Sequence, residues 1–317
     1  MTHIFLDCFG LNGRPRNDLS AKHFSRKTSK RKDVSMNISE IIKQPDFNIT
    51  IAGIGLFTAG VLSLARWLIK TSLGRKALLD SLPRRNDMTA FMPFIPLFIW
   101  FGSITAAVSI TDGLLPNLPD WQKAAVNNLI LCIGALIAAA VIIFLAKTCF
   151  ARQLKGFGLD IKTLPRDFFA AAANLVSVWP LVILTIILTV VIGQLIWGED
   201  FRIEQHEELK LIGTFTQLPV RVLIIIATII IAPIFEEMLF RGLFQTMIRS
   251  FLVRPWLSIA VCSAFFAIVH QNPAHWPALF VLSMCLGYSY EKSGSLFRPI
   301  FIHLLFNAVG IISVLYQ

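Results

Sequence analysis

Long apolar runs constrain this chain more than any other feature of its sequence. About eight runs are close to the ~20 residues that a helix needs to cross a bilayer, and 55% of the 317 residues are hydrophobic. Only 15% are charged, against roughly 25% in a soluble domain, so a soluble enzyme is excluded. The sequence therefore predicts an all-α, polytopic transmembrane helical bundle of about eight spans. Their approximate bounds are 49–69, 90–110, 125–146, 169–197, 222–245, 256–270, 277–290 and 299–316.

The positive charge of the chain belongs to its connecting loops. The formal net charge is +10, from 29 Lys and Arg against 19 Asp and Glu. Most of these basic residues lie in short loops between the apolar runs, where positive residues set the orientation of a membrane protein. We therefore attribute the charge to topology and to contact with anionic membrane lipid, and expect no nucleic acid partner. The pattern predicts an integral multi-pass protein of the plasma (inner) membrane.

Three regions follow from the distribution of charge and hydropathy. Residues 1–47 are basic and are expected to be disordered, residues 48–168 hold the N-terminal transmembrane helices, and residues 169–317 hold the chemistry. One strongly polar stretch, 198–210, separates two runs and is expected on the outer side. His275 and Trp276 follow Pro273 in a short outer loop, where an interfacial anchor is the expected role. The five cysteines show neither metal-ligand spacing nor a disulfide framework.

Ionisable residues are concentrated in the last third of the membrane-embedded sequence. A charge at the centre of a bilayer costs ~2.5 to 3.5 kcal/mol on insertion scales, so such residues persist only when they are paired or hydrated. Embedded ionisable residues are for this reason functional candidates. The candidates here are Glu236, Glu237, Arg241, His270 and His303, together with the polar Asn307.

Helical spacing divides the first three candidates into two roles. Glu237 and Arg241 are four residues apart, so they share a helix face and can form an ion pair. Glu236 points roughly 100° away from Glu237, so the two carboxylates cannot serve one partner in the same way. We interpret Glu237 with Arg241 as supporting structure and Glu236 as free for chemistry. The plainer interpretation is a hydrated cluster of all three at a helix end.

Two further pairs at the same spacing add imidazole and amide groups. Phe266 and His270 are four residues apart, as are His303 and Asn307. A single buried histidine is usually a hydrogen-bonded core residue, but this set can hold and polarise a water. A carboxylate or imidazole would remove its proton while a His and the Asn amide stabilise an oxyanion. Alternatively, nitrogens of His270 and His303 and an oxygen of Glu236 could bind zinc.

Three stretches of the sequence resemble the CPBP intramembrane proteases. APIFEEMLFRGLF (232–244) is similar to the family's EExxxR motif, and FAIVH (266–270) to its FxxxH motif. GYSYEKSGSLFRPIFIHLLFN (287–307) resembles the Gly-rich turn followed by HxxxN. The family includes type II CAAX prenyl endopeptidases, lysostaphin-resistance-A-like proteins, and bacteriocin-processing and immunity proteins. The resemblance covers about residues 175–315.

The resemblance implies an intramembrane endopeptidase, of the metallo or the glutamate type. Glu236 would activate water with help from His270, and His303 with Asn307 would stabilise the transition state or bind metal. The other motif residues, Glu237, Arg241 and Phe266, would support the site. The substrate would be a membrane-associated or lipid-modified, CAAX-like protein or peptide, reached from the cytoplasmic side.

Two other classes of function remain open at this stage. In a proton-coupled transporter, Glu236 and the histidines would relay protons, and such a protein would spread polar residues over several spans. In a non-catalytic membrane scaffold or immunity protein, the same pocket would serve for binding, and its residues could be replaced without loss of function.

Overall fold

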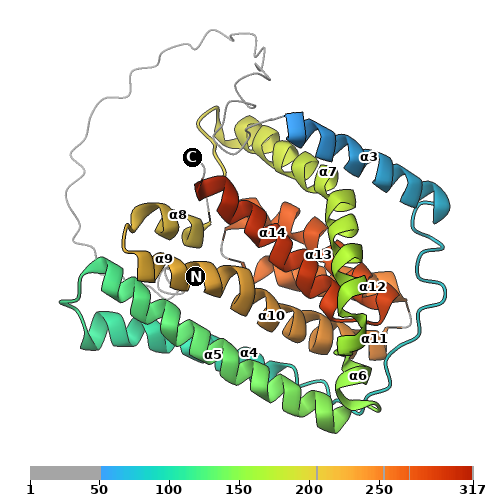
Figure 1. Ribbon diagram of the computed structural model, residues 1–317, viewed down its shortest axis with the longest axis horizontal. Coiled ribbons are helices and arrows are strands. Elements are labelled where there is room, and N and C mark those ends of the chain that lie inside the picture. The colour runs from blue at the N-terminus through green and yellow to red at the C-terminus, as the bar shows by residue number, and fades with distance from the viewer. Residues whose placement is uncertain (1–50, 205, 253, 271, 316–317) are drawn as a thin grey trace.

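The fold is a bundle of helices. The computed structural model describes residues 51–204, 206–252, 254–270 and 272–315. Within these ranges the regular elements are helices, apart from one isolated β-bridge between Asn86 and Phe150 (Figure 1). The predicted all-α bundle is confirmed. The basic segment 1–47 lies outside the described residues.

The first half of the described chain forms four long helices and one short one. They are α3 (Ile51–Lys70), α4 (Phe94–Val108) with the π-helical turn η1 (Ser109–Leu114), α5 (Asp120–Cys149), α6 (Gln153–Phe157) and α7 (Leu164–Trp197), which the 3₁₀ turn η2 (Ile161–Thr163) precedes.

The second half forms the part of the bundle that carries the candidate site. Its helices are α8 (Glu207–Thr214), α9 (Leu218–Ile226), α10 (Ala232–Glu237), α11 (Thr246–Phe251), α12 (Pro255–Ile268), α13 (Trp276–Ser293) and α14 (Phe297–Leu315). Two π-helical stretches, η3 (Ala227–Ile231) and η4 (Met238–Gln245), and the 3₁₀ turn η5 (Pro273–His275) connect them.

Within the described residues each of the eight apolar runs is mainly helical, and six of the helices are long and apolar enough to cross a membrane. These six run over Gly53–Lys70, Phe94–Leu114, Asp120–Cys149, Ile161–Trp197, Leu218–Phe251 and Phe297–Leu315. The other two runs, 256–270 and 277–290, correspond to α12 and α13. At 1.5 Å per residue the 14 residues of α12 extend only ~21 Å, short of the ~30 Å hydrocarbon core. Helix α13 ends in a polar stretch that includes Glu291 and Lys292.

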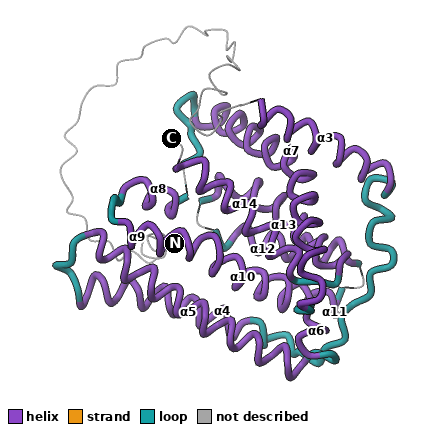
Figure 2. The backbone as a smooth tube through the Cα atoms, in the orientation of Figure 1, coloured by secondary structure: helices purple, strands orange, loops and turns teal. Residues whose placement is uncertain are grey.

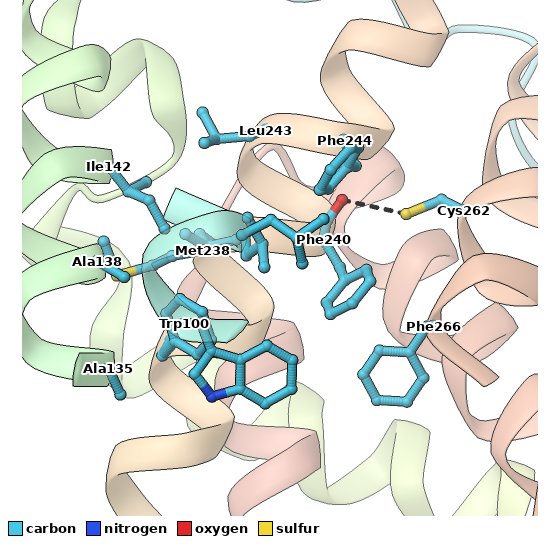
Figure 3. Close-up of a cluster of buried hydrophobic side chains, with 14 of the residues drawn as sticks. Trp100, Ala135, Ala138, Ile142, Met238, Phe240, Leu243, Phe244, Cys262 and Phe266 are labelled. Carbon is cyan, nitrogen blue, oxygen red and sulfur yellow. Dashed lines mark hydrogen bonds between the residues drawn. The ribbon is translucent and has the colours of Figure 1, made fainter. Parts of the chain in front are cut away.

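The main hydrophobic core packs η4 between α4 and α5 on one side and α12 on the other (Figure 3). Ala135 and Ala138 on α5 are small and buried, which lets the neighbouring chain approach closely. The Phe240 ring meets the Phe266 ring edge to face at 5.1 Å between centroids. The Cys262 thiol also donates to the Phe240 carbonyl over 3.1 Å. These contacts fix η4 against α12.

Helix α7 forms the opposite wall and contacts α3, α13 and α14. It contains Pro180, which cannot donate to the carbonyl of Val176, and the helix bends in Figure 1. A Cβ on Gly60 of α3 would collide with that carbonyl and with the Pro180 ring. Beside this contact the Ser63 and Ser177 hydroxyls are hydrogen-bonded at 2.6 Å. Glycine at position 60 thus allows the close approach of α3.

The long connection between α3 and α4 runs along the edge of the bundle (Figure 2). Arg84 lies over the Tyr290 ring, 3.6 Å from its centroid, and donates to the Tyr290 carbonyl. Asn86 donates to the Ser250 hydroxyl of α11 over 3.2 Å. The connection therefore ties α11 and α13 together at the end of the bundle next to η4.

Candidate active site

The helix that carries both glutamates is wider than an ideal α-helix on each side of them. Residues 218–251 run as one helical segment in which η3 precedes and η4 follows the α-helical Ala232–Glu237. Pro233 has no N–H to continue the regular hydrogen-bond ladder, which accounts for a wide turn next to it. At the end of η4 the hydroxyl of Thr246, the first residue of α11, donates to the Arg241 carbonyl, five residues earlier, over 3.2 Å. Such π-helical turns are frequent at functional sites.

The ion pair predicted from the four-residue spacing forms in the structure. The Arg241 Nη1 donates to Glu237 Oε1 over 2.9 Å, and the side chains are 1% and 0% exposed. The Arg241 Nη2 donates to the Ser283 hydroxyl of α13 over 2.7 Å. Its guanidinium carbon also lies 4.6 Å from the centroid of the Phe266 ring, within the range of a cation–π interaction. The buried positive charge of Arg241 therefore has three stabilising contacts: the Glu237 carboxylate, the Ser283 hydroxyl and the Phe266 ring.

His303 lies between the two glutamates. Its Nδ1 is 2.9 Å from Glu237 Oε1, and its Nε2 is 3.9 Å from Glu236 Oε2. Because an ionised carboxylate only accepts hydrogen bonds, the Nδ1 must carry the hydrogen. In a neutral ring this leaves the Nε2 lone pair facing Glu236. The two carboxylates thus contact one imidazole in different ways, in agreement with the ~100° that separates them on the helix.

His270 lies in the turn after α12 rather than on the helix. The expected run 256–270 placed Phe266 and His270 on one helix face, but α12 ends at Ile268. The His270 Nδ1 is 2.7 Å from the Phe266 carbonyl, so this nitrogen carries the hydrogen and the Nε2 is the acceptor. The ring of Phe266 lies 4.6 Å from that of His270 and 5.9 Å from that of His303. The two imidazoles therefore flank one buried phenyl ring.

Asn307 contacts the same helix two turns before the glutamates. Its Nδ2 donates to the Thr228 carbonyl of η3 over 2.8 Å. A primary amide has a second N–H and an acceptor oxygen, which this contact leaves for other partners. Asn307 thus joins α14 to the wide turn that leads into α10.

The metal hypothesis gains no support from the arrangement of these side chains. Catalytic zinc sites use three protein ligands. Among the described residues no group of three or more His, Cys, Asp or Glu side chains is placed to hold a metal ion. The buried Glu237 Oε2, in contrast, has no hydrogen-bond partner. A water that donates to that oxygen would satisfy it.

Two residues near the site were not assigned to it from the sequence. Ser283 bonds to Arg241, and no motif marks a serine in an apolar helix. Trp276, expected as an interfacial anchor, donates from its Nε1 to the His270 carbonyl over 2.7 Å. Ser283 meets Arg241 from another helix, and Trp276, the first residue of α13, bonds to His270 in the loop before it, so helical spacing could not have indicated either contact.

Comparisons with known proteins agree with the motif resemblance. The family model for type II CAAX prenyl endopeptidase Rce1-like proteins matches residues 218–309, which contain all seven candidate site residues. This match confirms the resemblance to the CPBP family. The segment thus resembles a family of intramembrane proteases.

A curated relative gives less information about function. It is an uncharacterized 24.3 kDa protein of Escherichia coli, 24% identical over 127 residues, which are 39% of this chain. The match spans 58% of that relative's length. No solved structure matches the chain significantly.

Proposed function

We propose that this protein is a CAAX-type intramembrane endopeptidase that hydrolyses a peptide bond of a membrane-associated or lipid-modified protein. The observation that carries the proposal is the position of His303 between Glu236 and Glu237. It gives a carboxylate oxygen and an imidazole lone pair that face each other 3.9 Å apart, in a nearly buried site. Together they can hold one water molecule.

Activation of that water follows from the hydrogen-bond roles of the two groups. The water would donate one hydrogen to Glu236 Oε2 and the other to His303 Nε2. Glu236 would take a proton as the water oxygen attacks the carbonyl carbon of the scissile bond, and would return it to the amine nitrogen as the C–N bond breaks. Glu237, by accepting from Nδ1, would keep His303 in the required tautomer.

Stabilisation of the oxyanion falls to the remaining polar groups. The second amide hydrogen of Asn307 is a suitable donor. Neutral His270 has its hydrogen on Nδ1, bound to the Phe266 carbonyl, so its Nε2 would accept rather than donate. We therefore place His303, and not His270, next to Glu236 in the chemical step, and assign His270 to orienting water or substrate. A zinc mechanism would require the side chains to rearrange. Measuring cleavage after treatment with a chelator tests that alternative.

The substrate and its route follow from the membrane topology. The positive charge of the loops favours a cytoplasmic position for the end of the bundle near Arg298, where Arg298 bonds to Asp167 of α7. His303 is one to two helical turns from Arg298. A substrate whose lipid or apolar anchor lies in the inner leaflet would present its peptide chain at this depth.

The decisive experiment compares peptide termini in membranes from cells that express the wild type or Glu236→Gln, at equal expression. The variant keeps the shape of the side chain and removes the base, so cleavage should fall by about 10²- to 10⁴-fold. Glu199→Gln, an exposed carboxylate in the polar stretch, is the matched control and should cleave as the wild type does. Termini that are the same in wild type and Glu236→Gln would refute the proposal.

A further inference from the structure

Buried side chains of α13, of the continuous segment α10–η4 and of α14 form a continuous polar chain that ends at the proposed site. The Ser283 hydroxyl accepts from Arg241 Nη2 over 2.7 Å, and Arg241 Nη1 donates to Glu237 Oε1 over 2.9 Å. The same Oε1 accepts from His303 Nδ1 over 2.9 Å. All four residues are buried. Three helices are therefore linked through one carboxylate oxygen.

Ser283 determines how Arg241 presents its guanidinium. Arg241 and Glu237 lie one turn apart on one helical segment, so the planar guanidinium could bind the carboxylate through one nitrogen or through two. The contacts of Nη2 with the Ser283 hydroxyl, and more weakly with the Ser283 carbonyl at 3.4 Å, direct this nitrogen toward α13. Only Nη1 then bonds to Glu237.

The single contact matters because His303 depends on the same oxygen. Glu237 Oε1 accepts from both Arg241 and His303, whereas Oε2 has no hydrogen-bond partner. Without the Ser283 hydroxyl, the Nη2 would keep only the long contact of 3.4 Å with the Ser283 carbonyl, a weak bond for a buried charged donor and therefore costly. The nearest remedy is rotation toward Glu237 Oε2, which would move the carboxylate and the imidazole that it holds.

We infer that Ser283 is a positioning residue of this site, which acts through Arg241 and Glu237 to set the orientation and Nδ1 hydrogen of His303. The inference rests on the proposed function for its effect on catalysis, but not for its effect on His303. A merely structural serine would contribute to packing and leave the imidazole unchanged. The two roles can therefore be separated by a measurement made on His303 itself.

The first readout needs no substrate. Full-length protein with ¹⁵N-histidine, in nanodiscs, gives a nitrogen spectrum in which His303 is identified by its loss in His303→Gln. In Ser283→Ala the His303 Nδ1 signal is expected to shift or broaden. Ser283→Thr, which keeps the hydroxyl, should retain the wild-type signal. Ser258→Ala is the matched control, because Ser258 is also buried but bonds to the Arg254 carbonyl of its own helix.

The second readout is cleavage of a substrate identified by the termini experiment. We expect kcat of Ser283→Ala to fall about tenfold, which corresponds to roughly 1.4 kcal/mol, with KM unchanged and activity retained in Ser283→Thr. If Ser283→Ala does not fold, Ser283→Cys, which keeps the volume with a weak acceptor, replaces it in both readouts.

The outcomes separate this inference from the proposed function. An unchanged His303 signal in Ser283→Ala, or an equal change in Ser258→Ala, would overturn the positioning role. A shifted His303 signal in a protein whose wild type cleaves nothing would support the positioning role and refute the protease. A shifted signal together with the tenfold loss of kcat is the result expected if both hold.

Discussion

Replacement by glutamine should lower the stability of the fold at Glu237 but not at the adjacent Glu236. Glu237→Gln removes the negative partner of Arg241, which is 1% exposed. Loss of one partner of a buried ion pair costs about 3 to 5 kcal/mol. The lower figure applies here because Arg241 keeps the Ser283 hydroxyl and the Phe266 ring. Glu236→Gln removes a buried carboxylate whose contact with the neutral His303 ring is 3.9 Å long, so it should leave stability unchanged or higher.

The assay is thermal unfolding of purified protein in detergent or nanodiscs, together with cleavage. A loss of about 3 kcal/mol corresponds to a decrease in Tm of roughly 6 to 12 °C for a domain of this size class. We expect that decrease in Tm for Glu237→Gln. For Glu236→Gln we expect a Tm at or above that of the wild type, with cleavage lower by about 10²- to 10⁴-fold. The dissociation of stability from activity is what the two different environments predict.

A double-mutant cycle tests whether the ion pair is the cause. Arg241→Met combined with Glu237→Gln removes both charges, so the double variant should be less destabilised than the sum of the single variants, by about 0.5 to 3 kcal/mol. Purely additive effects, or a Tm of Glu237→Gln within about 2 °C of the wild type, would show that the pair does not stabilise the fold as reasoned. A Tm of Glu236→Gln below that of the wild type would contradict the proposal that Glu236 serves catalysis rather than stability.

Three further outcomes are expected. Gly60→Ala should lower Tm, because overpacking against Pro180 costs roughly 1 to 3 kcal/mol. Gly55→Ala, where nothing lies within 4 Å of the added Cβ, should leave Tm unchanged. Equal effects of the two substitutions would contradict the close contact of α3 with α7. Burial lowers the pKa of His206, so the unfolded chain binds more protons, and stability should fall as the pH decreases through about 6.5; a His206→Gln variant with the same dependence of Tm on pH from 8 to 5 would refute this role. Cleavage by purified protein should persist after treatment with EDTA or 1,10-phenanthroline, and a loss that added zinc restores would favour the metal mechanism.

Sequence and structure agree wherever contacts follow from the geometry of one helix. The bond between Glu237 and Arg241 was predictable because four residues nearly complete a turn. The apolar runs were predictable as helices because a bilayer offers no partner for unpaired backbone groups. The same periodicity was less informative for His270, since α12 ends two residues before it and the imidazole bonds back to the Phe266 carbonyl from the turn.

The sequence by itself determined the class of fold, the family resemblance and the residues proposed for the site. The tertiary structure alone decided how they meet: which nitrogen of His303 faces Glu236, that Glu237 Oε1 serves two donors, and that Ser283 supports Arg241 from 42 residues away. The physical reason is that spacing along one helix fixes only the neighbours on its own surface. Contacts between helices depend on how those helices cross and pack.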